Sequence, residues 1–102
     1  MSANSGLSDS SVVVRSSDVV EAEVDGEIVA LNIERGTCYG LNKVGSRIWQ
    51  IVSQPSRVTD IGARLIAEYE VDEETCRQQV LELLEDLRNE GLIRIVEAPT
   101  AP

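Results

Sequence analysis

The sequence predicts an α+β domain of the winged helix-turn-helix type: a three-stranded antiparallel N-terminal meander, then three helices and a short C-terminal strand. This prediction rests on two changes of pattern. Apolar residues follow strand-like patterns up to residue 41 and recur at helical spacing from residue 42, and a short apolar run returns at 92–96. The length of 102 residues fits one domain, which buries a single modest core without disulfides or metals.

The meander is indicated by alternation and by turn residues. In residues 20–24, valine and alanine alternate with glutamate, which is typical of a half-buried strand. Asp25-Gly26 is a strong hairpin signal, because a type I′ turn needs positive φ at both central positions. The three strands are expected at 20–24, 28–33 and 37–41, with a second turn at 34–36.

Three helices are predicted between residues 42 and 91. Asn42 and Asp72 are suitable N-caps for the first and third helices, Pro55 ends the first, and Gly91 stands where a glycine commonly ends a helix. The second helix is expected at 58–69. The expected apolar stripes are Val44, Ile48, Ile51 and Val52; Val58, Ile61, Leu65 and Tyr69; and Cys76, Val80, Leu83, Leu84 and Leu87. The core is expected to contain Trp49, Ile48, Val52, Ile61, Leu65, Leu83 and Leu87, with Trp49 as its largest member.

The ends of the chain are expected to lie outside the domain. Residues 1–11 are rich in serine, asparagine and glycine and are predicted to be a disordered segment, the domain spans 12–97, and 98–102 are a disordered tail. Residues 12–14 either add a further short strand or only lead into the meander. No apolar run is long enough for a signal sequence or a transmembrane helix, so a cytoplasmic location is expected.

Composition excludes several kinds of function. Eighteen acidic and nine basic residues give a net charge of −9 and a pI near 4.3, which opposes binding to nucleic acid or anionic membranes. There is no histidine, and Cys38 and Cys76 are the only cysteines, so neither a metal site nor a cofactor is expected. No carboxylate stands beside a lysine or a glycine-rich turn that would tune it for catalysis, so the chain is not expected to be an enzyme.

DNA binding is the usual function of a winged helix, but the charge of the third helix opposes it. A recognition helix normally brings arginine and lysine to phosphates and bases. Between residues 72 and 91 there are two basic residues, Arg77 and Arg88, against the acidic residues Asp72, Glu73, Glu74, Glu82, Glu85, Asp86 and Glu90. A winged-helix transcription factor is therefore the weaker alternative.

The third strand offers a different function. A meander leaves an outer strand with unpaired backbone groups, which can pair with another strand. Residues 37–41 form that edge if they lie outermost, and Gly40 is the kind of residue that permits close approach of another backbone. An ordinary edge strand, with a glycine that serves packing, explains the same residues.

Residues 25–93 resemble the PqqD-like family, the recognition elements for precursors of ribosomally synthesised and post-translationally modified peptides. Two motifs carry the resemblance: G-x-x-Y-x-L-N-x-x-G-x-x-I-W at residues 36–49 and E-Y-x-V-D at residues 68–72. Either motif alone is weak, but both in this order and at this spacing are specific. The resemblance covers about two-thirds of the chain and is greatest to the free-standing leader-binding proteins of lasso-peptide pathways.

The resemblance implies a peptide-binding domain rather than an enzyme. In this family the leader of a precursor peptide adds as a strand to the edge of the meander and rests in a groove between the third strand and the third helix. The implied partners are the precursor peptide, a leader peptidase, and a cyclase or other maturation enzyme; the alternative is a PqqD-type protein that presents a precursor to a radical S-adenosylmethionine enzyme. Peptide contacts are expected at Thr37, Cys38, Tyr39, Gly40, Leu41, Arg77, Val80, Leu81 and Leu84.

Two further hypotheses follow from this groove. The net negative charge favours a leader with basic groups, steered by acidic residues such as Glu73, Glu74 or Glu82. Cys38 and Cys76 fall on opposite walls of the expected groove and could approach one another. Strand alternation nevertheless points Cys38 away from the face of Tyr39, so two free thiols with a structural role are predicted.

Overall fold

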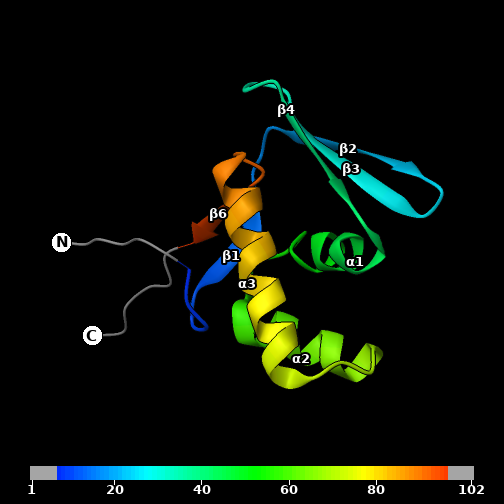
Figure 1. The fold of residues 1–102 in the computed structure, drawn as a ribbon. Coiled ribbons are helices and arrows are strands. Elements are labelled where there is room, and N and C mark those ends of the chain that lie inside the picture. Colours follow the sequence, from blue (N-terminus) through cyan, green and yellow to red (C-terminus); the bar gives the residue numbers. More distant parts are fainter. Residues whose placement is uncertain (1–6, 97–102) are drawn as a thin grey trace, which may run out of the picture.

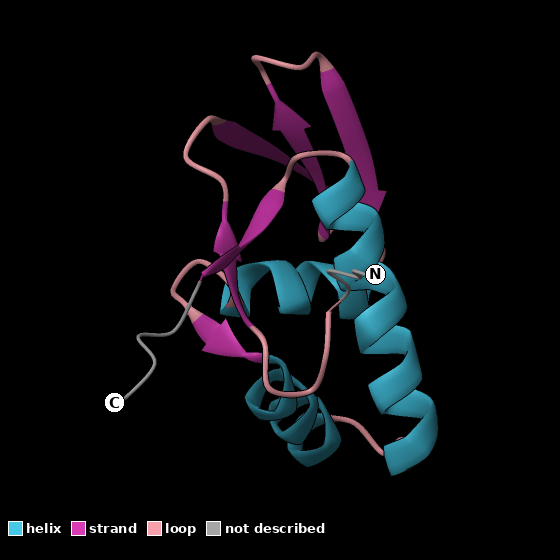
Figure 2. Cartoon of the chain, turned by 90° about the vertical axis from the view of Figure 1, so that its left-hand side faces the viewer, coloured by secondary structure: helices cyan, strands magenta, loops and turns pink. Residues whose placement is uncertain are grey.

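The computed structural model describes residues 7–96. Within this range the elements are two small antiparallel sheets and three helices (Figure 1). In chain order they are β1 (Val12–Arg15), β2 (Val19–Val24), β3 (Glu27–Asn32), β4 (Thr37–Leu41), α1 (Lys43–Ile51), β5 (Ser56–Arg57), α2 (Val58–Glu68), α3 (Glu73–Asn89) and β6 (Ile93–Val96). Figure 2, turned by 90°, shows α3 extending along one side of the molecule. No helix in the described part is long and apolar enough to cross a membrane.

The predicted meander is confirmed as the sheet β2-β3-β4, with β3 in the centre. Its first turn has φ of 55° at Asp25 and 82° at Gly26, as a type I′ hairpin requires. Residues 12–14 do not extend this sheet. They belong to β1, which pairs with β6 and β5 in a second sheet.

The expectation that β2 is half-buried was wrong. Val20 is 47% exposed and Val24 is 61% exposed, and both lie on the face of the meander that turns away from the helices. Alternation correctly predicted a strand, but no element of the described chain covers this face. The alternating pattern therefore predicts the strand conformation of β2, but it does not predict whether the apolar side chains of β2 are buried.

The helices begin and end close to the predicted residues. The side chain of Asn42 accepts a hydrogen bond from the backbone N–H of Gly45, and that of Asp72 accepts one from Thr75, so both predicted N-caps are confirmed. Gly91 has φ of 76°, the left-handed conformation common after a helix. Of the seven predicted core residues, all but Leu83 are buried, and Trp49 has no exposed surface. Leu83 is half-buried because it packs against the edge of the core and also borders a groove.

Trp49 joins the two sheets to α1. Its indole Nε1 donates to Glu21 Oε1 on β2 at 2.7 Å, and its backbone carbonyl accepts hydrogen bonds from Arg15 on β1. Arg15 also pairs with Glu21 at 3.0 Å and lies over the indole ring, 4.4 Å from the centroid. These contacts fix the meander relative to the helices and thereby position β4.

Residues 7–11 differ from the expected disordered segment. The Leu7 N–H donates to Glu85 at 3.2 Å, Asp9 pairs with Arg77 at 2.9 Å, and the Ser11 carbonyl accepts from Val58 at 2.9 Å. The segment thus packs against α2 and α3, because its polar groups meet those of the helices. The other residues expected to be disordered, 1–6 and 98–102, lie outside the described residues, as does residue 97, the expected end of the domain.

Candidate functional site

Strand β4 is an open edge of the meander. It pairs with β3 on one side, and no strand of the described chain pairs with the other. In an antiparallel pair every second residue directs its N–H and C=O outward, so these groups of β4 face away from the sheet. Of the four edge strands in residues 7–96, β4 is the one without a charged side chain: β2 carries Glu21 and Glu23, β5 carries Arg57 and β6 carries Arg94. Charges at an edge discourage pairing with another chain, so β4 is the edge best suited to accept a strand.

The side chains of β4 alternate between two faces. On the inner face, Thr37 Oγ1 donates to the Glu90 carbonyl at 2.8 Å and Tyr39 donates to Asp86 at 3.1 Å, which ties the strand to the end of α3. Leu41 on the same face is 3% exposed. Cys38 and Gly40 point to the opposite face and are exposed, as alternation predicted.

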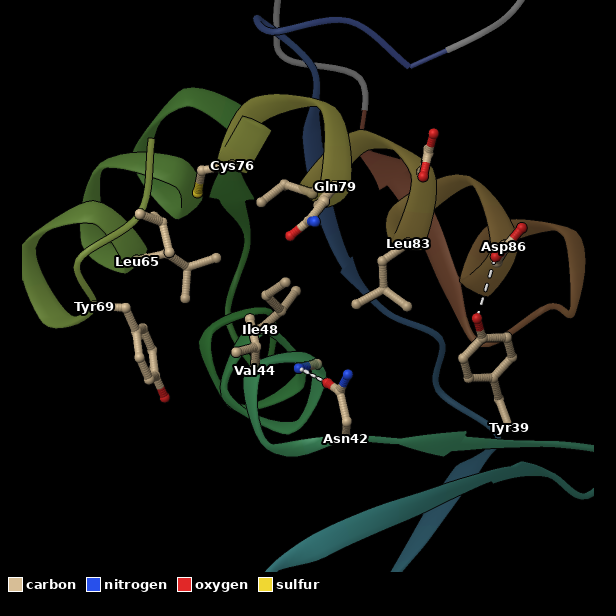
Figure 3. Close-up of a pocket in the computed structure, with 14 residues that line it drawn as sticks. Tyr39, Asn42, Val44, Ile48, Leu65, Tyr69, Cys76, Gln79, Leu83 and Asp86 are labelled. Atoms are coloured by element: carbon tan, nitrogen blue, oxygen red, sulfur yellow. Dashed lines mark hydrogen bonds between the residues drawn. The ribbon is translucent and has the colours of Figure 1, made fainter. Parts of the chain in front are cut away.

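A groove of about 410 Å³ lies between this edge and α3 (Figure 3). Its long wall is one side of α3, its floor is formed by α1 and α2, and Tyr39 and Tyr69 stand at its two ends. We refer to it as the groove. It is lined by Tyr39 and Asn42; Val44, Gly45 and Ile48; Leu65, Tyr69 and Val71; and Cys76, Gln79, Val80, Glu82, Leu83 and Asp86.

The groove combines an apolar centre with a polar margin. Val44 and Val71 are 39% and 42% exposed, although both are aliphatic, and Leu83 on the facing wall is half-buried. Such open apolar surface is suited to receive apolar side chains from a partner. Glu82 and Asp86 make the margin on the α3 side acidic.

Two titratable groups in the groove have shifted pKa values. Burial, the hydrogen bond to Asp86 and the charge of Glu90 raise the pKa of Tyr39, so the phenol stays neutral and donates to the carboxylate. Burial raises the pKa of the Cys76 thiol. Cys76 is therefore a small apolar group of the groove wall at neutral pH.

The structure divides the predicted contact residues into three groups. Tyr39 and Val80 line the groove, and Thr37, Cys38, Gly40 and Leu41 accompany Tyr39 on β4. On α3, Leu84 is completely buried, Leu81 is half-buried and does not line the groove, and Arg77 pairs with Asp9 on another side of the helix. Contact with a peptide at any of these positions stays a prediction.

Sequence reasoning missed the face of α3 that lines the groove. That face carries Gln79, Glu82, Leu83 and Asp86, which follow helical spacing from Cys76. The available signal was Leu83 itself, which lies at the boundary between the apolar stripe and the polar side. Val44 and Val71 gave a second signal, as apolar residues beside predicted helix N-caps.

The two cysteines do not form a disulfide, as predicted. Cys38 is exposed on the outward side of β4, whereas Cys76 is buried in the groove wall. Within residues 7–96, no group of three or more cysteine and acidic side chains is arranged to hold a metal ion.

Fold and site together define a class of protein: a winged-helix-like α+β domain that carries an uncharged strand edge beside an apolar groove. Residues 27–93 match the model of the family described as coenzyme PQQ synthesis protein D, PqqD. The chain belongs to the PqqD family, as its motifs indicated.

Two solved structures are similar to this chain. One is TbiB1 in complex with the TbiA(beta) leader peptide, at a TM-score of 0.74 and 35% identity, covering 83% of this chain and 99% of that chain. The other is a lasso peptide synthetase B1 complexed with the leader peptide, at a TM-score of 0.70 and 22% identity, covering 80% of this chain and 96% of that chain; this likeness shows the fold alone. Among curated proteins, none matches the chain.

Proposed function

We propose that this chain is a non-catalytic carrier that binds the leader region of a ribosomally synthesised precursor peptide. The leader adds as a strand to the free edge of β4, and its inward side chains enter the groove. The observation that carries this proposal is the position of the uncharged edge strand directly beside an open apolar groove. The leader peptide bound in the similar TbiB1 structure supports it.

Strand addition divides affinity from specificity. Backbone hydrogen bonds along β4 supply affinity for an extended peptide, whatever its sequence. Side chains on one face of that peptide are spaced about 6.5–7 Å apart, since alternate residues of a strand share a face. Those side chains would rest against Leu83, Val44 and Val71, so apolar residues at alternate positions of the leader would be favoured.

We further propose that the bound leader is delivered to a leader peptidase and a cyclase of a lasso-peptide pathway. The resemblance of the motifs at residues 36–49 and 68–72 to the leader-binding proteins of lasso-peptide pathways supports this pathway. The family description, which refers to coenzyme PQQ synthesis, supports the second candidate: presentation of a precursor to a radical S-adenosylmethionine enzyme. The genes beside the one for this chain distinguish the two, since each pathway requires its own enzyme.

The test compares two leucines of α3 that are two positions apart. Leu83 lines the groove and Leu81 does not, yet both are half-buried. In a titration with a fluorescent leader peptide from the neighbouring precursor gene, we expect Leu83→Ala to raise the dissociation constant about tenfold, or about 1.4 kcal/mol, through lost apolar contact. Leu81→Ala is the matched control and should bind within about twofold of the unmodified chain.

A second measurement tests strand addition itself. Single N-methyl groups placed along the leader backbone should weaken binding at every second residue, because only alternate amides pair with β4. Equal weakening by N-methyl groups at all positions would contradict strand addition. Unchanged leader affinity in Leu83→Ala, together with reduced affinity in Leu81→Ala, would contradict the proposed use of the groove.

A further inference from the structure

Residues 7–11, which we call the strap, run beside α2 and α3 and cap the first of these helices. Two carbonyls of the strap accept from the first two backbone N–H groups of α2: Ser11 from Val58 at 2.9 Å and Asp9 from Thr59 at 3.2 Å. These bonds replace a side-chain cap, because Arg57 at the N-cap position makes no such bond. The start of α2 is therefore joined to the backbone of the strap.

Side-chain contacts join the same strap to α3. Arg77 Nε lies 2.9 Å from Asp9 Oδ2 and 3.0 Å from Asp9 Oδ1. The Leu7 N–H donates to Glu85 Oε2 at 3.2 Å. Each residue turns a helix by about 100°, so Leu83 in the wall of the groove points to roughly the opposite side of α3 from Arg77 and Glu85. The helix is thus held by the strap on one side and faces the groove with the other.

The first half of α3 lies between two hollows. The groove is on one side, a separate groove of about 270 Å³ between α2 and α3 is on the other, and Val80 lines both. In the seam between them, Cys76 Sγ lies 3.9 Å from the Gly62 carbonyl. Asp9 and Arg77 both line the separate groove. Their ion pair therefore crosses the side of α3 on which packing against α2 is incomplete.

The second half of α3 is joined to the meander instead. Thr37 on β4 donates to the Glu90 carbonyl. Tyr39 on the same strand donates to Asp86. The helix thus has two anchors, β4 near its end and the strap near its start. A change at the strap should therefore shift the first half of α3, where Gln79 lines the groove, more than the second half.

We propose that Asp9 and Arg77 are positioning residues for leader binding: their ion pair holds the first half of α3 where the groove has the width that the leader requires. This inference rests on the proposed function. Neither residue lines the groove, so the pair acts through α3 and not by contact with the leader. Arg77, which the sequence indicated as a leader contact, thereby has a different role. Since the strapped arrangement favours the leader, the leader must stabilise the strap by the same factor.

The experiment measures association and dissociation of the fluorescent leader peptide with the full chain by stopped flow. Asp9→Arg replaces attraction to Arg77 by repulsion, and we expect it to raise the dissociation rate constant about fivefold. The charge-swapped variant Asp9→Arg/Arg77→Asp restores an ion pair and should return that rate constant to within about twofold of the unmodified chain. Asp18→Arg is the matched control. It makes the same change in net charge at an exposed position before β2, so it should leave dissociation unchanged.

Hydrogen exchange gives a second readout, which a purely structural role of the ion pair would not change. The amides of Val58 and Thr59 donate to the strap and do not line the groove. In the unmodified chain, the leader should slow their exchange about fivefold, because the coupling between leader and strap is reciprocal. Asp9→Arg should remove this effect of the leader, whereas Asp18→Arg should keep it.

Unchanged dissociation of the leader from Asp9→Arg overturns the inference. Faster dissociation from Arg77→Asp that the charge swap does not reverse also overturns it, because Arg77 then contacts the leader directly. If Asp9→Arg does not fold, Asp9→Asn takes its place, with an expected rise in the dissociation rate constant of about twofold. The proposed function fails separately: in that case the unmodified chain does not bind the leader at all.

Discussion

Trp49 illustrates how much one residue contributes to this small domain. It is completely buried, and it contacts β1 and β2 through Arg15 and Glu21. We expect Trp49→Ala to lower the free energy of unfolding by about 3–5 kcal/mol, because it leaves a cavity and removes one of the two partners of Glu21, the other being Arg15. Urea denaturation measures the loss. For a domain of total stability about 5–15 kcal/mol, such a loss is a large fraction.

Val24→Ala is the control for this substitution. Val24 is 61% exposed, so its truncation should change stability by less than about 0.5 kcal/mol. A Trp49→Ala variant that unfolds at the same urea concentration as Val24→Ala would contradict the assigned role of Trp49.

At the residue scale, local features were predictable and distant partners were not. The caps at Asn42 and Asp72 depend on residues three positions away, and both were predicted. The partner of the Trp49 indole is Glu21, 28 positions earlier in the chain. Neither periodicity nor spacing contains that information, because the pairing depends on how β2 crosses α1.

At the scale of elements, the end of α3 depends on one glycine. Gly91 has φ of 76°, and a Cβ there would lie 2.6 Å from Arg35 Cδ and 3.0 Å from Asn32 Nδ2. We expect Gly91→Ala to destabilise the domain by roughly 1–2 kcal/mol through left-handed backbone strain, with additional loss if the Asn32 side chain moves from the Gly91 carbonyl. Thermal denaturation is the measurement.

Gly62 in α2 provides the matched comparison. A Cβ at Gly62 meets no atom within 4 Å, so Gly62→Ala should stabilise the domain by about 0.5–1 kcal/mol through helix propensity. Opposite signs are therefore expected for the two alanines. A Gly91→Ala variant as stable as Gly62→Ala would show that the conformation at residue 91 is not required.

The rotation of α3 shows the limit of element prediction. The sequence placed the helix within one or two residues and identified its buried stripe, of which Cys76, Val80, Leu84 and Leu87 are buried. The expected contacts at Arg77, Leu81 and Leu84 nevertheless lie off the groove, which Leu83 lines instead. Each residue turns the helix by about 100°, so the side of a buried stripe on which a groove opens depends on neighbouring elements.

At the scale of the whole molecule, the net charge of −9 bears on the rate of leader binding. Of the three acidic residues proposed for steering, Glu82 borders the groove, Glu74 lies near Arg77, and Glu73 lines a separate groove between α2 and α3. For a leader with basic groups, we expect Glu82→Gln to lower the association rate constant a few-fold at about 10 mM salt and to have little effect near 1 M. Stopped-flow fluorescence measures the rate.

Glu73→Gln also removes one negative charge, but from the separate groove between α2 and α3, so it should lower the association rate constant less than Glu82→Gln does. If the association rate constants of both variants are independent of salt, electrostatic steering is contradicted. The net negative charge then has the simpler role of keeping a protein with an open strand edge soluble.

The sequence by itself determined the meander at β2-β3-β4, its tight hairpin, the three helices with their caps, and the open edge at residues 37–41. These features depend on backbone preferences and side-chain periods that act between near neighbours in the chain. Only the tertiary structure decided that β1 pairs with β6, that Leu83 rather than Leu81 borders the groove, and that the face of the meander turned away from the helices is uncovered. Each of these depends on contacts between residues far apart in sequence, where local preference has no influence and packing selects the arrangement.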